Sequence, residues 1–261
     1  PPGAPRPGVR LSALAGAPTR CPARMPEDSD PPQPVGASDT AFGGTLLPLK
    51  KLPADSRYSR LLLERQQTLG SKDLSQQVKL PAGASEEEWL ALTTVDFFNE
   101  INLLAGAVQD ICTDATCPLM NAGSYEFMWA DETHQAPQKL SAPKYFETLL
   151  LWVDRKISDE EFLPTVPGVP FPPFFRQGIK VIYKRLFRIY AHIFHSHFRE
   201  MMEQEADAHL NHSFKHFIYF VKEFDLVEPK DLEPLQDLVA LCMRQKNDTI
   251  RSESEPPKQT T

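Results

Sequence analysis

Hydrophobic residues recur at helical spacing in several stretches, most clearly after residue 85. At intervals of four and three residues come Phe97, Ile101, Leu104, Val108 and Ile111. This spacing places the five side chains on one face of an α-helix, which we expect to lie in the core. Ser85 and Glu88 have the spacing of a capping box, in which a hydroxyl and a carboxylate satisfy free amides of the first turn. The pattern therefore predicts a helix that begins after Ser85.

Similar patterns predict further helices and one hairpin. The additional helices are expected at 54–69, from Pro143 to before Phe162, at 178–205, at 211–224 and after Pro229. Alternating aromatic residues at 125, 127 and 129 predict a small hairpin within 118–142. Five prolines in 164–173 exclude a helix there and indicate a connector. The fold class that follows is all-α.

Composition divides the chain into two unlike parts. Of the 25 prolines, 12 lie in residues 1–53, together with 6 of the 12 glycines. We expect 1–53 to be a disordered Pro/Gly-rich extension, 54–79 an N-terminal arm, 80–244 the helical domain and 245–261 a disordered tail. Four arginines and no acid in 1–24 are also typical of a transit peptide, but the tract lacks an apolar helical face. Met25 is a candidate natural start, which the sequence alone does not decide.

Charge and hydropathy exclude two classes of partner. The net charge of −7 argues against a generally basic surface for nucleic acid. No apolar run reaches the roughly 18 residues that a membrane-spanning helix needs. The N-terminus shows no secretory segment, so a reducing compartment is expected, where a close cysteine pair more often binds metal than forms a disulfide. We expect a cytoplasmic protein, with the nucleus as a second location.

Cysteines and histidines in two distant segments indicate a metal site. Cys112 and Cys117 have a spacing typical of two zinc ligands, and His192, His195 and His197 supply the imidazoles. Straight helical geometry favours His192 with His195, about 60° apart, whereas His192 with His197 needs a loosened or π-type turn. The competing interpretation is a pair of free buried cysteines beside a histidine-rich helix.

A third histidine pair and several missing motifs bear on the kind of metal site. His212 and His216 are better interpreted as core or capping residues than as ligands. Four protein ligands close a zinc shell and indicate a structural ion. The sequence has no H-E-x-x-H, G-x-S-x-G or P-loop motif. A zinc-dependent hydrolase is the alternative, and it requires that one of the four ligands does not bind.

Two charged faces are candidates for partner binding. Lys180, Lys184, Arg185 and Arg188 form a basic stripe, which is either a solvated face or a phosphate or phosphopeptide pocket. The helix after Ser85 has the opposite sign. Its acids are Glu86, Glu87, Glu88, Asp96 and Glu100. Such a surface suits a basic partner segment, although acids in a first helical turn also stabilise the helix itself.

Several motifs across residues 60–242 closely resemble the Mob (Mps one binder) family of kinase coactivators. They are Glu88-Trp89 with Thr94-Val95-Asp96-Phe97-Phe98-Asn99, Cys112 to Cys117 with Pro118, Ser141-Ala142-Pro143-Lys144-Tyr145, Gly168-Val169-Pro170-Phe171-Pro172, Lys184-Arg185-Leu186-Phe187-Arg188 through His197-Phe198, and Ser213-Phe214-Lys215-His216-Phe217. The Lys-Arg-Leu-Phe-Arg motif resembles that of the family branch that acts in the Hippo and mitotic-exit pathways. The resemblance implies a four-helix core with extra helices, a small hairpin and a structural Zn²⁺.

The same resemblance implies a function without catalysis. Members bind the N-terminal helical segment of NDR/LATS-type kinases and a phosphorylated Ste20-like kinase or scaffold, and we expect a monomer in isolation. A striatin-associated adaptor without kinase activation is the alternative within the family. By matching motif, the implied residues are Cys112, Cys117, His192 and His197 for zinc, Lys184, Arg185 and Arg188 for phosphopeptide, Glu88 and Asp96 for the kinase, and Thr68 for phosphorylation that releases an inhibitory arm.

Two positions depart from the family pattern. Ala84 stands where the family has an acid, with Glu86 and Glu87 as candidate substitutes. The segment Gly123-Ser124-Tyr125 is one residue shorter than usual, which predicts a tighter hairpin.

Overall fold

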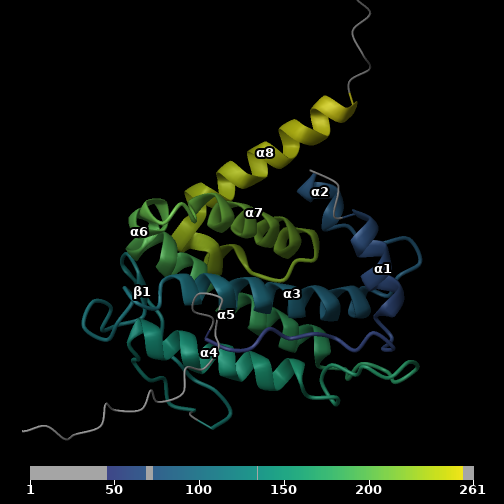
Figure 1. Ribbon diagram of the computed structural model, residues 1–261, viewed down its shortest axis with the longest axis horizontal. Coiled ribbons are helices and arrows are strands. Elements are labelled where there is room, and N and C mark those ends of the chain that lie inside the picture. The colour runs from purple at the N-terminus through teal and green to yellow at the C-terminus, as the bar shows by residue number, and fades with distance from the viewer. Residues whose placement is uncertain (1–45, 69–72, 134, 255–261) are drawn as a thin grey trace, which may run out of the picture. The chain divides into compact units, whose positions relative to one another are not determined.

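The computed structural model describes residues 46–68, 73–133 and 135–254 (Figure 1). All of them belong to one unit, which begins at Thr40. A second unit, Pro1–Asp39, lies outside the described residues. The disorder expected for 1–45 and for 255–261 therefore stays a prediction.

Four helices form the core, as the resemblance implies. They are α3 (Glu86–Ala107), α4 (Ala142–Ile157), α5 (Phe175–Ser196) and α7 (Asp207–Glu223). Helix α3 lies between α4 and α7 and also packs against α5 (Figure 1). The predicted apolar face is confirmed for Phe97, Ile101 and Val108, which are fully buried, and for Leu104, which is nearly so, whereas Ile111 is half-buried. Burial of such side chains contributes about 1.5–3 kcal/mol each, so this face holds the bundle together.

Further elements surround the core. They are α1 (Ser59–Thr68), α2 (Leu74–Gln77), α6 (Phe198–Glu203), the 3₁₀ helix η1 (Pro229–Leu235), α8 (Gln236–Ser254), and the strands β1 (Asn121–Ala122) and β2 (Tyr125–Glu126). The strands pair antiparallel with Ala122 opposite Tyr125, so only two residues form the turn. Gly123 in this turn has φ = 59°, a left-handed conformation that glycine adopts without steric cost. Within the described ranges, none of the helices combines the length and the apolarity that a membrane span requires.

The start of α3 forms half of the expected capping box. The amide of Glu88 donates to Ser85 Oγ at 3.5 Å, as predicted. The Ser85 hydroxyl donates to Glu87 Oε2 at 2.6 Å, whereas the Glu88 carboxylate accepts from Arg57. Helix α3 ends at Ala107, whereas the predicted helical face continues to Ile111.

Order begins earlier than expected, so the predicted disorder of 1–53 is wrong for residues 46–53. This extended segment runs along α3, where two asparagine side chains hold its backbone. Asn99 accepts from Lys50 N at 2.7 Å and donates to Lys50 O at 2.8 Å. Asn102 makes the same pair of bonds with Leu47, at 3.1 and 2.6 Å. Each amide thus replaces the hydrogen bonds that an adjacent β-strand would supply.

The predicted disorder of 245–261 is also wrong for residues 245–254, because α8 continues to Ser254. Lys246 is only 8% exposed despite its charge. Its ammonium group pairs with Glu223 at 3.0 Å and lies 5.4 Å from the ring centroid of Tyr219. These contacts with α7 hold the helix past the point where the apolar pattern stops.

Candidate metal centre and charged surfaces

Four side chains from two distant segments meet beside the hairpin. The ligand atoms of Cys112, Cys117, His192 and His197 all lie within 4.8 Å of one another, and all four residues are buried. Both cysteines follow the end of α3, while His192 lies in the last part of α5 and His197 directly follows that helix. Two thiols and two imidazoles in this arrangement could hold a metal ion.

The distances between donor atoms fit a tetrahedral ion. Cys112 Sγ lies 3.5 Å from His192 Nε2, and Cys117 Sγ lies 3.4 Å from His197 Nε2. Bonds of about 2.3 Å to sulfur and about 2.0 Å to nitrogen, at a tetrahedral angle, predict an S···N separation of about 3.5 Å. The second nitrogen of His192, Nδ1, is 2.8 Å from the carbonyl oxygen of Asn121 and donates to it. This bond leaves the Nε2 lone pair directed toward the sulfurs.

Burial sets the protonation of these groups. It raises the pKa of the Cys112 thiol, and the neighbouring Cys117 raises it further. It lowers the pKa of His192 to about 4, partly offset by the bond to Asn121, and it also lowers the pKa of His197. The imidazoles are therefore neutral and able to ligate at neutral pH. A bound cation would reverse the effect on the thiols by favouring the thiolates.

The preference for His195 from straight helical geometry is wrong. Helix α5 ends at Ser196, and His197 has φ = −133°, outside the helical range. The end of the helix at Ser196 therefore allows His197 to approach His192. An unbroken helix over 178–205 would have needed a π-type turn to bring the two together. His195 is not part of the Cys/His group. Its Nε2 donates to the carbonyl oxygen of Pro234 at 2.9 Å.

The other histidine pair does not join this group. His216 is half-buried, with its ring centroid 4.9 Å from that of Phe97, whereas His212 is exposed. Burial lowers the pKa of His216 to about 4, and the nearby Arg65 contributes. His216 thus contacts the core from its edge, and neither histidine belongs to the Cys/His group.

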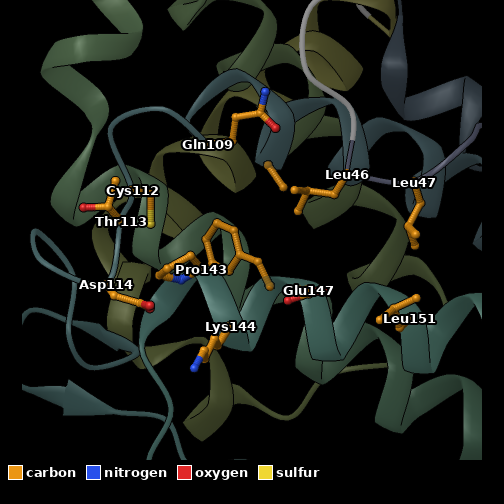
Figure 2. Close-up of a pocket in the computed structure, with 12 residues that line it drawn as sticks. Leu46, Leu47, Gln109, Cys112, Thr113, Asp114, Pro143, Lys144, Glu147 and Leu151 are labelled. Atoms are coloured by element: carbon orange, nitrogen blue, oxygen red, sulfur yellow. The ribbon is translucent and has the colours of Figure 1, made fainter. Parts of the chain in front are cut away.

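A cavity of about 440 Å³ lies beside the metal centre, between the end of α3 and the start of α4 (Figure 2). Cys112 forms part of its wall, and Leu46 and Leu47 form another part. The extended segment that precedes α1 thus completes a surface of the helical domain. The division at residue 53 has no counterpart in the structure.

The predicted phosphopeptide residues separate into two environments. Arg185 and Arg188 face the hairpin region and α4. Arg185 lies 4.6 Å from the ring centroid of Trp129 and 4.4 Å from that of Trp152, and it donates to Ala130 O at 2.6 Å. Arg188 is only partly buried and donates to Tyr145 Oη at 2.6 Å. Both arginines are half-buried; Arg185 lies over two tryptophan rings, whereas Arg188 contacts a tyrosine hydroxyl and the ring of Phe127.

Lys184 has a different partner. Its ammonium group pairs with Asp231 in η1 at 2.9 Å. One turn earlier, Lys180 pairs with Asp225 at 3.1 Å. Both lysines of the predicted stripe thus bind acids of the connection between α7 and α8, which the sequence pattern did not indicate.

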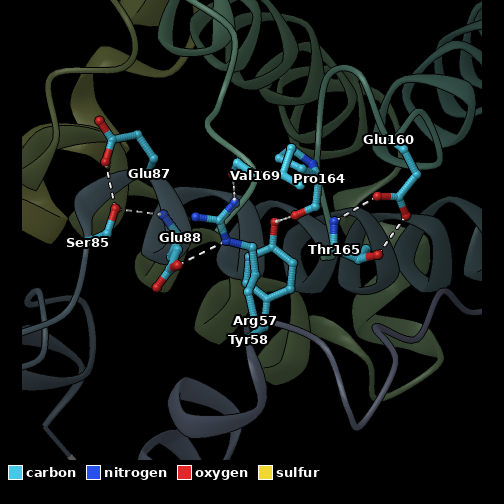
Figure 3. A network of polar contacts seen from close by, with 9 residues as sticks. All are labelled: Arg57, Tyr58, Ser85, Glu87, Glu88, Glu160, Pro164, Thr165 and Val169. Carbon is cyan, nitrogen blue, oxygen red and sulfur yellow. Dashed lines mark hydrogen bonds and ion pairs between the residues drawn. The ribbon is translucent and has the colours of Figure 1, made fainter. Parts of the chain in front are cut away.

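Arginines of the N-terminal arm cover the acidic residues of α3. Arg57 pairs with Glu88, with Nε 2.9 Å from Oε1 (Figure 3), and Arg65 pairs with Asp96. The candidate substitutes for the missing family acid are also engaged, since Glu86 pairs with Arg176 and Glu87 accepts from Ser85. Thr68 is the last residue of α1, and its side chain lies outside the described part of the structure.

Comparison with known proteins gives a consistent result. The family model described as Mob1/phocein family matches residues 66–235. The chain is 47% identical over 197 residues to "MOB kinase activator-like 1A" of Medicago sativa subsp. falcata, and equally to the protein of that name in Arabidopsis thaliana; each match covers 75% of this chain and 92% of the relative. It is 46% identical over 202 residues to "MOB kinase activator-like 1 homolog A" of Dictyostelium discoideum, covering 77% and 95%.

Proposed function

Since the chain belongs to the Mob1/phocein family, we propose that it is a non-enzymatic, kinase-activating adaptor. Its kinase partner is the basic N-terminal helical segment of an NDR/LATS-type kinase. The observation that carries this proposal is that the acidic face of α3 already holds basic residues of a helical arm, through Arg65 with Asp96 and Arg57 with Glu88. A face that accepts arginines from its own chain has the charge and shape to accept them from a partner.

The ion of the Cys₂His₂ group is proposed to be Zn²⁺. Two thiolates and two neutral imidazoles are a donor set that zinc prefers. Zinc would join the end of α3 to the end of α5 and would supply rigidity, because four protein ligands leave no position for a reactive water. This donor set supports the adaptor over the zinc hydrolase.

The second partner is proposed to be a phosphothreonine segment of a Ste20-like kinase or scaffold. Arg188 would bind the phosphate, because its guanidinium group can exchange its bond to Tyr145 for a bond to a phosphate oxygen. Lys184 would join it after release from Asp231. The neighbouring guanidinium groups of Arg185 and Arg188 would attract the negatively charged phosphate.

Phosphorylation of Thr68 is proposed to control access to the kinase face. A phosphate adds nearly two negative charges at the end of α1, the helix that carries Arg65. Repulsion between this phosphate and the acids of α3 would favour release of α1.

Calorimetric titration of an NDR/LATS-type kinase segment into the full chain tests the proposal. We expect binding to wild type, tighter binding to Thr68→Glu and weaker binding to Asp96→Asn. If wild type and Thr68→Glu both fail to bind, the kinase assignment is wrong, and the striatin-associated type of adaptor becomes the better interpretation.

A further inference from the structure

The acid that pairs with Lys184 is fixed in place by the segment that carries it. Asp231 lies in η1, and its side chain is only 19% exposed. The neighbouring Leu232 is buried in the core, and His195 of α5 donates to the carbonyl oxygen of Pro234 at 2.9 Å. These contacts hold η1 against α5, so the carboxylate of Asp231 stays beside that helix while the domain is folded.

The side chain of Lys184 is free to change its partner. It is 39% exposed, about twice as much as that of Asp231, and its ammonium group lies 2.9 Å from the Asp231 carboxylate. A lysine carries its charge on a flexible carbon stem. Arg188 lies four residues later, on the same side of α5. Rotation about the bonds of the Lys184 side chain can therefore carry the ammonium group from Asp231 toward Arg188.

A phosphate at this site would meet two cations in different states. Arg188 bonds to neutral groups, since its guanidinium group donates to Tyr145 Oη at 2.6 Å and to the carbonyl oxygen of Met128 at 3.4 Å. Lys184, by contrast, already has a carboxylate as its partner. Transfer of Lys184 to the phosphate breaks one ion pair for the one that it forms, so the attraction that Lys184 adds is reduced by the loss of Asp231.

We propose that Asp231 competes with the phosphate for Lys184 and thereby lowers the affinity of the site for a phosphothreonine peptide. Asp231 is a positioning residue, because it acts through Lys184 and does not contact the peptide. Binding moves the lysine side chain and leaves η1 in place. This inference rests on the proposed function, because it concerns the same phosphopeptide site, and it identifies the residue that limits the affinity of that site.

The chain offers a matched control for Asp231. Asp225, in the same connection between α7 and α8, pairs at 3.1 Å with Lys180, one turn earlier on α5. Its φ of 49° is a left-handed conformation that asparagine tolerates, so Asp225→Asn removes the same charge without straining the backbone. Lys180 is not among the residues proposed to bind the phosphate. General relief of charge repulsion would therefore appear in both variants, whereas the release of Lys184 would appear only in Asp231→Asn.

Calorimetric titration of a phosphothreonine peptide into the full chain tests the competition. Asp231→Asn should tighten binding about twofold to fivefold, the effect of one partly exposed ion pair, whereas Asp225→Asn should change it by less than about 1.5-fold. Asp231→Glu keeps the carboxylate and should bind the peptide as wild type does. When Lys184 is first replaced by Met, the further change Asp231→Asn should have no effect on the affinity, because the lysine through which Asp231 acts is gone.

Melting temperatures show whether each variant is folded, and Asp231→Ser is the second neutral variant if Asp231→Asn does not fold. Equal affinity of wild type and Asp231→Asn would overturn the inference and leave the proposed function standing. So would an equal gain in Asp225→Asn, an equal gain for the unphosphorylated peptide, or a gain that persists with Lys184→Met. If neither wild type nor Asp231→Asn binds the phosphopeptide, the phosphopeptide part of the proposed function is wrong, and this inference is wrong with it.

Discussion

The sulfur of Cys112 lies 3.5 Å from Nε2 of His192, although 80 residues separate them in the chain. With Cys117 and His197, they form a buried group that joins the end of α3 to the end of α5. Without an ion, this group would place two thiols and two imidazoles against one another with few other partners. The stability of the domain should therefore depend on the metal.

Metal removal is expected to destabilise the whole helical domain. A chelator should lower the melting temperature of wild type, and a loss of only about 3 kcal/mol corresponds to roughly 6–12 °C for a domain of this size. Cys117→Ser should lower both the zinc content, measured by elemental analysis, and the melting temperature. His195→Ala is the control and should retain the zinc. Purified protein without zinc, or melting that a chelator does not change, would contradict a structural ion.

Protonation of His216 should contribute to a fall in stability as the pH decreases from about 6.5 to about 4, as that of His192 does. Burial, with Arg65 and His212, lowers the pKa of His216 to about 4, so the folded state keeps it neutral while the unfolded state binds a proton below about 6.5. The contribution is present above pH 6.5 and lost toward pH 4, and it is at most about 3 kcal/mol. Glu100 has the opposite effect on stability. Burial raises its pKa, so the folded state binds a proton more readily than the unfolded state and protonation of Glu100 favours folding.

Thermal melting between pH 4 and pH 7 measures this effect. His216→Phe keeps an aromatic ring beside Phe97 and removes the titration, so its melting temperature should vary less with pH than that of wild type. Equal pH dependence in wild type and His216→Phe would show that His216 does not control it.

The helical core and the cysteine and histidine segments could be predicted because both depend on local spacing. Spacing alone could not choose between His195 and His197, because the choice depends on where α5 ends. The family resemblance implied His197, which is the histidine that the structure brings to the cysteines. The order of 46–53 was missed for a similar reason. Its leucines and prolines show no period, and the asparagines that hold it lie about 50 residues away. The arginines of the arm were missed as partners of Glu88 and Asp96 because isolated surface charges carry no signal of what they pair with.

The asparagine pair should protect residues 46–53 from proteolysis. Replacement of Asn99 and Asn102 by alanine removes the four hydrogen bonds to Lys50 and Leu47, each worth about 0.5–1.5 kcal/mol. The segment should then detach more often, and trypsin should cleave after Lys50 and Lys51 faster than in wild type. Mass spectrometry of timed digests measures the rate.

A substitution in the turn just after α3 is the control. Gln109→Ala changes a residue beside the adjacent cavity and leaves both asparagines in place, so cleavage after Lys50 should stay at the wild-type rate. Equal cleavage in wild type and the double variant would mean that other contacts hold the segment.

The two arginines of the proposed phosphate site should respond differently to truncation. Arg188 is partly exposed and can exchange its bond to Tyr145 for a phosphate oxygen, so Arg188→Ala should weaken a phosphothreonine peptide about 10-fold to 100-fold, the loss of one charge-assisted interaction. Arg185 stacks between Trp129 and Trp152, so Arg185→Ala should lower the melting temperature as well as the affinity. Arg199→Ala, in which an exposed arginine paired with Glu203 is removed, should change neither. Titration with the phosphorylated and unphosphorylated peptides separates phosphate binding from general attraction, and equal affinity of wild type and Arg188→Ala for the phosphopeptide would remove Arg188 from the site.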